Sequence, residues 1–363
     1  MVSRLSVALC VRPCATVAKG PLNNNLPVTV FAEPIVKTGT ATDNETMSAT
    51  EIDQETLQAL QARVGKIHLR QRLGMERVYE HKIFGQGRTF FHIENWSSLR
   101  PLIRVFLRMV MLHGRSRRNA RRIVVRENNI PVAGLPPEFE NFTILHITDL
   151  HLDIAPDFPH VLAEAVRPLE YDLCVLTGDY RAETYGPHQA ALDGLAQVRA
   201  QLGEEVYGVL GNHDTVCMLP AIEAMGIRML MNEQVAVQRG GKYIYLAGVD
   251  DPHYFRADNL EKAADAIPDD AISILLSHSP EIYKPARHAD FNVMLCGHTH
   301  GGQICLPGGI AVIKNASCRR EFCAGAWNYY GMAGYTSKGS GACVVDVRIN
   351  CPPEIVLHHL HVA

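Results

Sequence analysis

Five short apolar segments from residue 142 onward are each followed at once by polar residues. They are rich in β-branched residues and almost continuously apolar, which predicts strands buried on both faces. Helical spacing over 158–169 and 187–202 separates some of them, and strands and turns alone follow residue 303. We expect an α/β fold, with two sheets between outer helices in a four-layer α/β/β/α sandwich. The five segments are FTILHIT (142–148), DLCVLTG (172–178), VYGVLGN (206–212), ISILLSH (272–278) and FNVMLCG (291–297).

The first part of the chain has a different pattern. Residues 1–50 are rich in Asn, Thr, Pro and Ala and show no sustained period, so we expect a disordered leader. Residues 52–75 and 98–112 have apolar positions at helical spacing, as in Leu57, Leu60, Val64 and Ile67. We therefore divide the chain into a leader (1–50), a helical, arginine-rich N-terminal extension (51–128) and a C-terminal α/β domain (129–363).

A basic stretch ends the extension. Nine arginines and no acidic residue occur from Arg100 to Arg126, and Arg100, Arg104 and Arg108 recur every four residues. Three interpretations stay open for residues 98–126: a solvated face or linker, an amphipathic helix on an anionic membrane surface, or a nucleic-acid patch. The net charge of −3 argues against nucleic-acid binding by the whole chain.

Composition narrows the class of protein further. A chain of 363 residues with 47% hydrophobic residues can bury a large core, and no run of eighteen apolar residues predicts a transmembrane helix. The ten cysteines form no C-x-x-C pair, and two of them lie in apolar strands. This usage predicts a reduced, cytoplasmic protein, at the inner face of the membrane if the basic stretch binds lipid. Oligomeric state has no signal in the sequence.

Metal-capable side chains follow each of the five predicted strands. Ligands bind outside the carboxyl ends of strands in α/β sheets, so these side chains are expected to converge. A single Asp, Asn or His after a strand usually belongs to an ordinary turn. Metal-capable residues at five successive strand ends instead indicate a metal site. Gly178, Gly211 and Gly297 each precede a candidate and allow the backbone to approach closely. The candidates are Asp149 and His151, Asp179, Asn212 with His213 and Asp214, His278, and finally His298 and His300.

The set D-x-H, G-D, G-N-H-D, H and G-H-T-H resembles the calcineurin-like metallophosphoesterases over residues 142–361. Within that superfamily the chain is similar to a membrane-associated bacterial branch, through TGDY (177–180), LLSHSP (275–280) and GHTHGGQI (297–304). The resemblance implies the metallo-dependent phosphatase fold. Members of the branch act on UDP-2,3-diacylglucosamine, which suggests a nucleotide-linked lipid as substrate.

The resemblance also implies a role for each candidate. Asp179 would bridge two metals, and His213 would face the substrate with its ring oriented by Asp214. The first metal would be held by Asp149, His151, Asp179 and His300, and the second by Asp179, Asn212, His278 and His298.

The donor chemistry agrees with these roles. Carboxylate and imidazole donors suit two divalent ions such as Mn²⁺, Fe²⁺ or Zn²⁺, which would activate a shared water as hydroxide for attack on phosphorus. His213 would protonate the leaving oxygen, and Arg181 is expected to contact the substrate phosphate. We expect hydrolysis of a phosphodiester or pyrophosphate bond. The alternatives are a phosphomonoesterase or nuclease of the same fold, or a non-catalytic interaction module.

Overall fold

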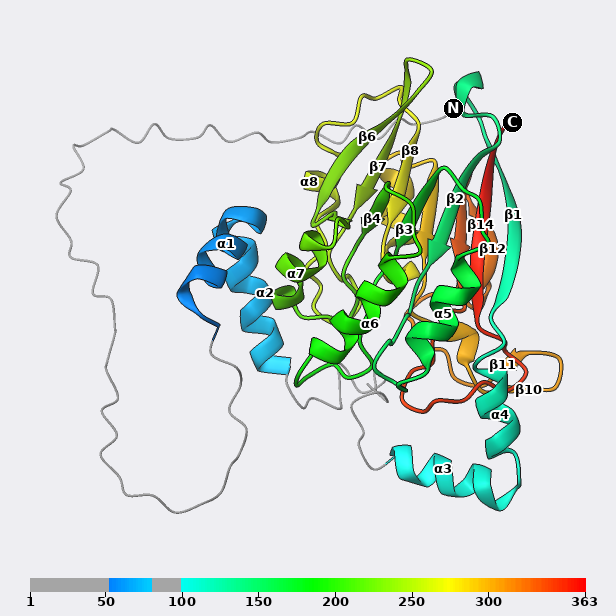
Figure 1. The fold of residues 1–363 in the computed structure, drawn as a ribbon. Coiled ribbons are helices and arrows are strands. Elements are labelled where there is room, and N and C mark those ends of the chain that lie inside the picture. The colour runs from blue at the N-terminus through cyan, green and yellow to red at the C-terminus, as the bar shows by residue number, and fades with distance from the viewer. Residues whose placement is uncertain (1–51, 80–98) are drawn as a thin grey trace, which may run out of the picture. The chain divides into compact units, whose positions relative to one another are not determined.

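The computed structural model describes residues 52–79 and 99–363, and the predicted leader over 1–50 lies outside these ranges. Two six-stranded sheets form its centre (Figure 1). The first has the order β1 (Val124–Val132), β14 (Glu354–Val362), β2 (Phe142–Ile147), β3 (Leu173–Leu176), β4 (Val206–Gly208) and β5 (Arg228–Met229). The second has the order β12 (Gly325–Tyr329), β13 (Met332–Thr336), β9 (Val293–Cys296), β8 (Ser273–Leu276), β7 (Lys242–Gly248) and β6 (Glu233–Arg239).

The two sheets pack face to face on one apolar core. Ile144 and Val175 of the first sheet lie in the same buried cluster as Ile274 and Leu295 of the second. Helices cover the outer faces, which confirms the predicted four-layer α/β/β/α fold. The first sheet carries α5 (Phe158–Val166), α6 (Gln189–Arg199) and α7 (Leu219–Ala224), and the second carries α8 (Leu260–Ala264) and α9 (Tyr283–His288).

Parallel pairing brings the carboxyl ends of the predicted strands together. In the first sheet β2, β3 and β4 are parallel neighbours, and in the second β7, β8 and β9 are parallel neighbours. The loops that follow β2, β3, β4, β8 and β9 carry the candidate residues. The structure therefore delivers these loops to the same end of both sheets, as the sequence predicted.

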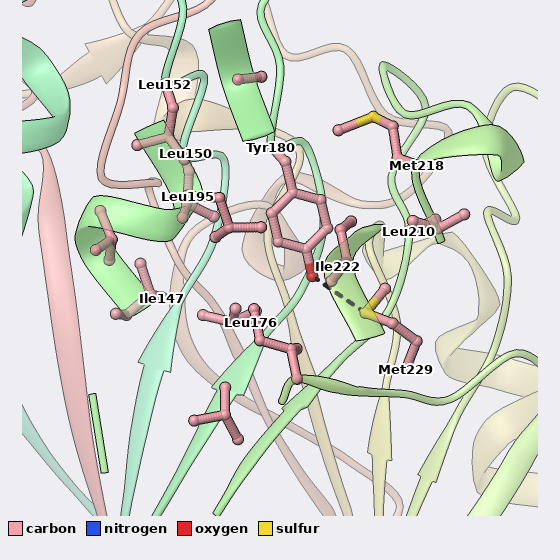
Figure 2. Packing of buried hydrophobic residues seen from close by; sticks show 14 of the residues in the cluster. Ile147, Leu150, Leu152, Leu176, Tyr180, Leu195, Leu210, Met218, Ile222 and Met229 are labelled. Atoms are coloured by element: carbon pink, nitrogen blue, oxygen red, sulfur yellow. Dashed lines mark hydrogen bonds between the residues drawn. The ribbon is translucent and has the colours of Figure 1, made fainter. Parts of the chain in front are cut away.

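Tyr180 fixes one of these loops in the core. Its ring is fully buried, and Figure 2 shows it between Leu176, Leu210 and Met229. Its hydroxyl donates to the carbonyl of Val209 at 3.2 Å, so the phenol has a partner inside the apolar cluster. This anchor holds the turn that presents Asp179 on the other side of the backbone.

The first predicted helix is two helices. Gly65 separates α1 (Gln54–Val64) from α2 (Lys66–Tyr79) and has a φ of 88°. This left-handed conformation ends α1 and changes which face of the next helix meets the core. As a result Leu60 and Val64 are buried as predicted, whereas Ile67 is 73% exposed.

The arginine-rich segment folds as α3 (Leu99–Met109) and α4 (His113–Asn119) and then enters the first sheet as β1. The domain therefore begins inside the range 51–128, and we place its boundary before Val124 rather than after residue 128. Sequence reasoning missed β1 because the pairing partner, β14, lies at the other end of the chain. Across residues 52–79 and 99–363, we find no helix whose length and hydrophobicity together would suffice for a membrane span.

Candidate metal centre

The seven predicted ligands lie together in a buried cluster. Every one of them is at most 6% exposed. Asp179 is at the centre: its Oδ2 is 3.2 Å from His278 Nε2 and 3.8 Å from His151 Nε2. Donor atoms of Asp179, His278 and His298 all lie within 4.8 Å of one another, as do those of Asp149, His151 and Asp179. Asp179 thus belongs to both groups, as a bridging residue would.

Each group is completed by a further candidate. Asn212 Oδ1 is 2.9 Å from His278 Nε2, and His298 Nδ1 is 3.2 Å from the same nitrogen. In the other group His300 Nε2 is 3.3 Å from Asp149 Oδ1 and 3.1 Å from His151 Nε2. The two groups match the two ligand sets that the resemblance implied.

Hydrogen bonds fix which ring nitrogen of three histidines faces the cluster. A carbonyl oxygen can only accept, so a ring nitrogen bonded to one must carry the proton, and the other nitrogen of a neutral ring presents its lone pair. Three rings donate in this way: His151 Nδ1 to Arg181 (2.8 Å), His278 Nδ1 to Thr177 (2.8 Å) and His298 Nε2 to Asn315 (2.5 Å).

The backbone of the cluster is strained. Positive φ angles are uncommon for residues with a Cβ and gather at functional sites. The main chain at Gly297 packs closely against the loop after β2, since an added Cβ would collide with Thr148 Oγ1 and Asp149 Oδ2. Five of the predicted ligands have a positive φ: Asp149, His151, Asp179, His298 and His300.

Comparison with known proteins shows what the part of the chain that carries this cluster is similar to. Residues 142–302 match the model of the calcineurin-like phosphoesterase family. Over this range the chain is similar to the calcineurin-like phosphoesterases. The matched range contains all seven candidate ligands.

Three relatives illustrate this similarity. The uncharacterized metallophosphoesterase YkoQ of Bacillus subtilis is 26% identical over 68% of this chain and 93% of its own length. A transmembrane protein with metallophosphoesterase domain from Bos taurus is 31% identical over 64% of this chain, but the alignment spans only 57% of that protein. Phosphodiesterase YaeI of Escherichia coli is 24% identical, over 60% of this chain and 82% of its own length.

Neighbouring carboxylates and imidazoles in the cluster change one another's pKa values. Burial raises the pKa of the Asp149 carboxyl. Burial also opposes ionisation of Asp179, but the nearby His278 and His213 outweigh it and hold the pKa of Asp179 well below its usual range. For His278, burial disfavours the charged ring, but Asp179 and other carboxylates prevail and raise its pKa to about 10. The site thus favours positive charge beside Asp179.

The prediction that Asp214 orients the ring of His213 is wrong. The carboxylate of Asp214 instead accepts from the main-chain N–H groups of Gly211, Asp179 and Tyr180 at 2.8–2.9 Å. Burial, and then the charge of Asp179, raise the pKa of Asp214 to about 6. Asp214 therefore ties two strand-end loops together.

The prediction that Arg181 contacts the substrate is also wrong. Arg181 is buried, and its guanidinium donates to the main-chain carbonyls of His213, Thr184 and Gly186. A buried guanidinium needs hydrogen-bond acceptors for its N–H groups, and here the main chain of neighbouring loops provides them. The side chain therefore holds these loops together. The hydroxyl of Thr184 lies 3.3 Å from His213 Nδ1.

Arg348 is a site residue that sequence reasoning missed. It is fully buried, and its Nη1 donates to the carbonyl of His300 at 3.0 Å while its Nη2 lies 3.1 Å from His300 Nδ1. The guanidinium also donates to the carbonyls of Lys338 and Gly341. Its signal in the sequence was an arginine inside the apolar run VVDVRI.

A cavity of about 330 Å³ opens beside the cluster. Asp179, Asn212, His213, His298 and His300 line one side of it. Its other side is largely apolar and is formed by Ile103 of α3 and by Ile304, Val312, Ile313, Val344 and Val345.

Proposed function

We propose that this protein uses two divalent cations to hydrolyse a phosphodiester or pyrophosphate bond. One observation carries the proposal: the donor atoms of Asp179, His278 and His298, and those of Asp149, His151 and Asp179, form two buried groups, each within 4.8 Å, that share Asp179. Carboxylates and imidazoles buried this close together need positive charge between them, and divalent cations held by these donors would supply it in place of the proton on His278. The oxygen and imidazole donors of the cluster suit Mn²⁺, Fe²⁺ or Zn²⁺.

Seven residues would hold the two cations, with Asp179 shared between them. When bound, the cations would supply positive charge to the phosphoryl oxygens and lower the pKa of a water between them. Asp149, His151 and His300 would complete one set, and Asn212, His278 and His298 the other. Main-chain contacts fix these side chains in advance, which lowers the cost of assembling the site.

His213 would donate the proton that the leaving oxygen needs. Its ring lines the cavity, and its Nε2 lies 4.0 Å from Asp179 Oδ2. The main chain around it is fixed, because its N–H donates to Asp179 Oδ1 at 2.9 Å and its carbonyl accepts from Arg181. A histidine held at this place can transfer a proton near neutral pH.

The apolar side of the cavity supports a lipid-linked substrate. A phosphoester bound at the cluster would extend its remaining groups along Ile103, Ile304 and Val344. A purely polar ester would leave these side chains against water, whereas an acyl chain would bury them. A nucleotide-linked lipid such as UDP-2,3-diacylglucosamine combines both chemistries.

The surface beside the cavity supports attachment to an anionic membrane. Leu102, Phe106 and Met109 of α3 are 63%, 56% and 70% exposed. Ile310 of β11 (Ile310–Ala311) and the following Val312, which lines the same cavity as Ile103, are similarly exposed. Five exposed arginines without an acidic partner among the described residues flank this apolar surface. They are Arg104, Arg108, Arg115, Arg118 and Arg122. An amphipathic helix of this kind binds the interface of an anionic bilayer.

Turnover of model esters tests the proposal. The purified chain should hydrolyse bis-nitrophenyl phosphate faster than mono-nitrophenyl phosphate, lose activity with a chelator and regain it with Mn²⁺ or Zn²⁺. Preference for the monoester would favour the phosphomonoesterase alternative. Cleavage of DNA or RNA would favour the nuclease, and a chain that binds no metal and turns over neither ester would be an interaction module.

A further inference from the structure

Cys343 lies among the histidines of the first ligand set. Donor atoms of His151, His300 and Cys343 all lie within 4.8 Å of one another. The thiol is half-buried, lines the cavity and approaches His213 Nε2 to 3.6 Å. Among the described cysteines, Cys343 is the one that joins such a group of three metal-capable residues.

The position of Cys343 is fixed by the side chain of Gln303. The Cys343 N–H donates to Gln303 Oε1 at 2.8 Å, and Gln303 Nε2 donates back to the Cys343 carbonyl at 2.8 Å. The loop that carries Cys343 also contacts the turn that carries Asp149 and His151, since the N–H of Gly341 donates to the carbonyl of Asp149 at 2.8 Å. Two independent anchors therefore hold the sulfur beside His151 and His300.

Other cysteines near the site have different surroundings. Cys305 Sγ contacts the carbonyl of Gly301 at 3.3 Å, and Cys351 Sγ contacts the carbonyl of His300 at 3.2 Å. Both are buried, and both thiols can donate to those carbonyls. Cys343 instead faces imidazole nitrogens, which are the partners of a thiol in transition-metal sites.

We propose that Cys343 is an additional ligand of the cation held by His151 and His300, and that it gives this position a preference for Zn²⁺ or Fe²⁺ over Mn²⁺ and Mg²⁺. The inference rests on the proposed dinuclear function. Thiolate is a soft donor and selects softer cations, whereas carboxylate alone accepts the harder ones. On binding, the sulfur–metal bond replaces the S–H bond, the proton leaves to solvent, and no electron is transferred.

Cobalt(II) is the probe, because a thiolate bound to it gives a near-ultraviolet charge-transfer band that imidazole and carboxylate do not. The metal-free full chain is titrated with Co²⁺, and bound cobalt is counted separately by elemental analysis. We expect the band in the native chain and in Cys217→Ser, a matched half-buried thiol that belongs to none of the groups of metal-capable donors. Cys343→Ser and Cys343→Val should both lose it and bind Zn²⁺ more weakly by about tenfold or more, at least the loss seen for outer-shell partners.

Several results would overturn the inference. Cobalt bound without the band, or a band that persists in Cys343→Val, would show that Cys343 is not a ligand while leaving the dinuclear site intact. An unchanged ratio of Zn²⁺ to Mn²⁺ affinity in Cys343→Ser would contradict the proposed selectivity. A native chain that binds no cobalt or zinc would overturn the proposed function together with this inference. Circular dichroism of each variant separates loss of a ligand from loss of the fold.

Discussion

The guanidinium of Arg72 donates to the main-chain carbonyl of Asp214 at 2.9 Å. Arg72 belongs to α2, in the N-terminal extension, and Asp214 ends the strand loop that carries His213. The Nε of Arg72 is also 3.2 Å from Asp250 Oδ2, and Glu76, one turn later in α2, accepts from the N–H of Val216 at 2.9 Å. The extension is thus part of the frame that positions the candidate site.

Arg72→Met should destabilise the protein by about 3–5 kcal/mol, because it leaves the carboxylate of Asp250 buried without its arginine. The matched control is Arg63→Met in α1, whose ion pairs with Glu223 and Glu233 are partly exposed and should cost about 1 kcal/mol or less. Urea unfolding of both variants gives the comparison. Equal, small losses would mean that α2 does not stabilise the site loops.

His213→Ala should keep the bound metal and lower turnover by about 10²–10⁴-fold, the usual contribution of a general acid. The loss should be larger for an alkyl leaving group than for nitrophenolate, which departs without a proton. His160→Ala, an exposed histidine on α5, is the control and should change neither value. If His213→Ala loses the same factor on both leaving groups, the histidine has a different role.

A buried histidine pair makes stability depend on pH. Burial lowers the pKa of His146 to about 3, and burial followed by the neighbouring His146 lowers that of His358 well below its usual range. The unfolded chain takes up protons near pH 6.5 while the folded pair stays neutral, so stability falls as the pH drops below that value. Between pH 7.5 and pH 5 each histidine should reduce the free energy of unfolding by about 2 kcal/mol.

Unfolding midpoints across this range, for the native chain and a His146→Phe/His358→Phe variant, isolate the effect. The variant should be less stable at pH 7.5, because Asn128 and Thr177 lose the ring nitrogens they contact. Its pH dependence should nevertheless be flatter. Parallel curves for the two proteins would show that the pair is not responsible.

Phe106→Glu combined with Met109→Glu should abolish flotation of the chain with vesicles that contain phosphatidylglycerol, because two charges enter the apolar face of α3. Ile67→Glu on α2 is the control, since Ile67 is as exposed as Met109 but lies outside the arginine-rich surface. The native chain and the control should float, and salt should weaken their binding. A native chain that ignores anionic vesicles would refute the membrane proposal.

The sequence was sufficient to predict the five strands that lead into the site and the chemistry of the residues that follow them. Each apolar run is followed directly by residues of the site. These positions could be predicted because the burial of a strand and its end both depend on the local sequence. The pattern around Asp179 and the pair His298 and His300 therefore predicted the cluster directly. The position of Gly297 directly before His298 likewise predicted that the backbone approaches the site closely there.

The supporting contacts could not be predicted, because they join segments that are distant in sequence. Arg72 reaches Asp250, and Gln303 holds Cys343, and neither pairing leaves a periodic signal. Arg181 was misjudged for the same reason, since its position after the GDY motif does not reveal that its guanidinium is turned toward main-chain carbonyls. Asp214 likewise bonds to main-chain N–H groups that only the folded loops bring near.

Counting bound metal in Asp179→Ala tests the central claim most directly. The native full chain, stripped with a chelator and reloaded with Zn²⁺ or Mn²⁺, should bind two cations and recover diester hydrolysis. Asp179→Ala should bind fewer than two and show no turnover, whereas the exposed Asp193→Ala on α6 should behave as the native chain does. Two tightly bound cations in Asp179→Ala, or none in the native chain, would contradict a dinuclear site bridged by Asp179.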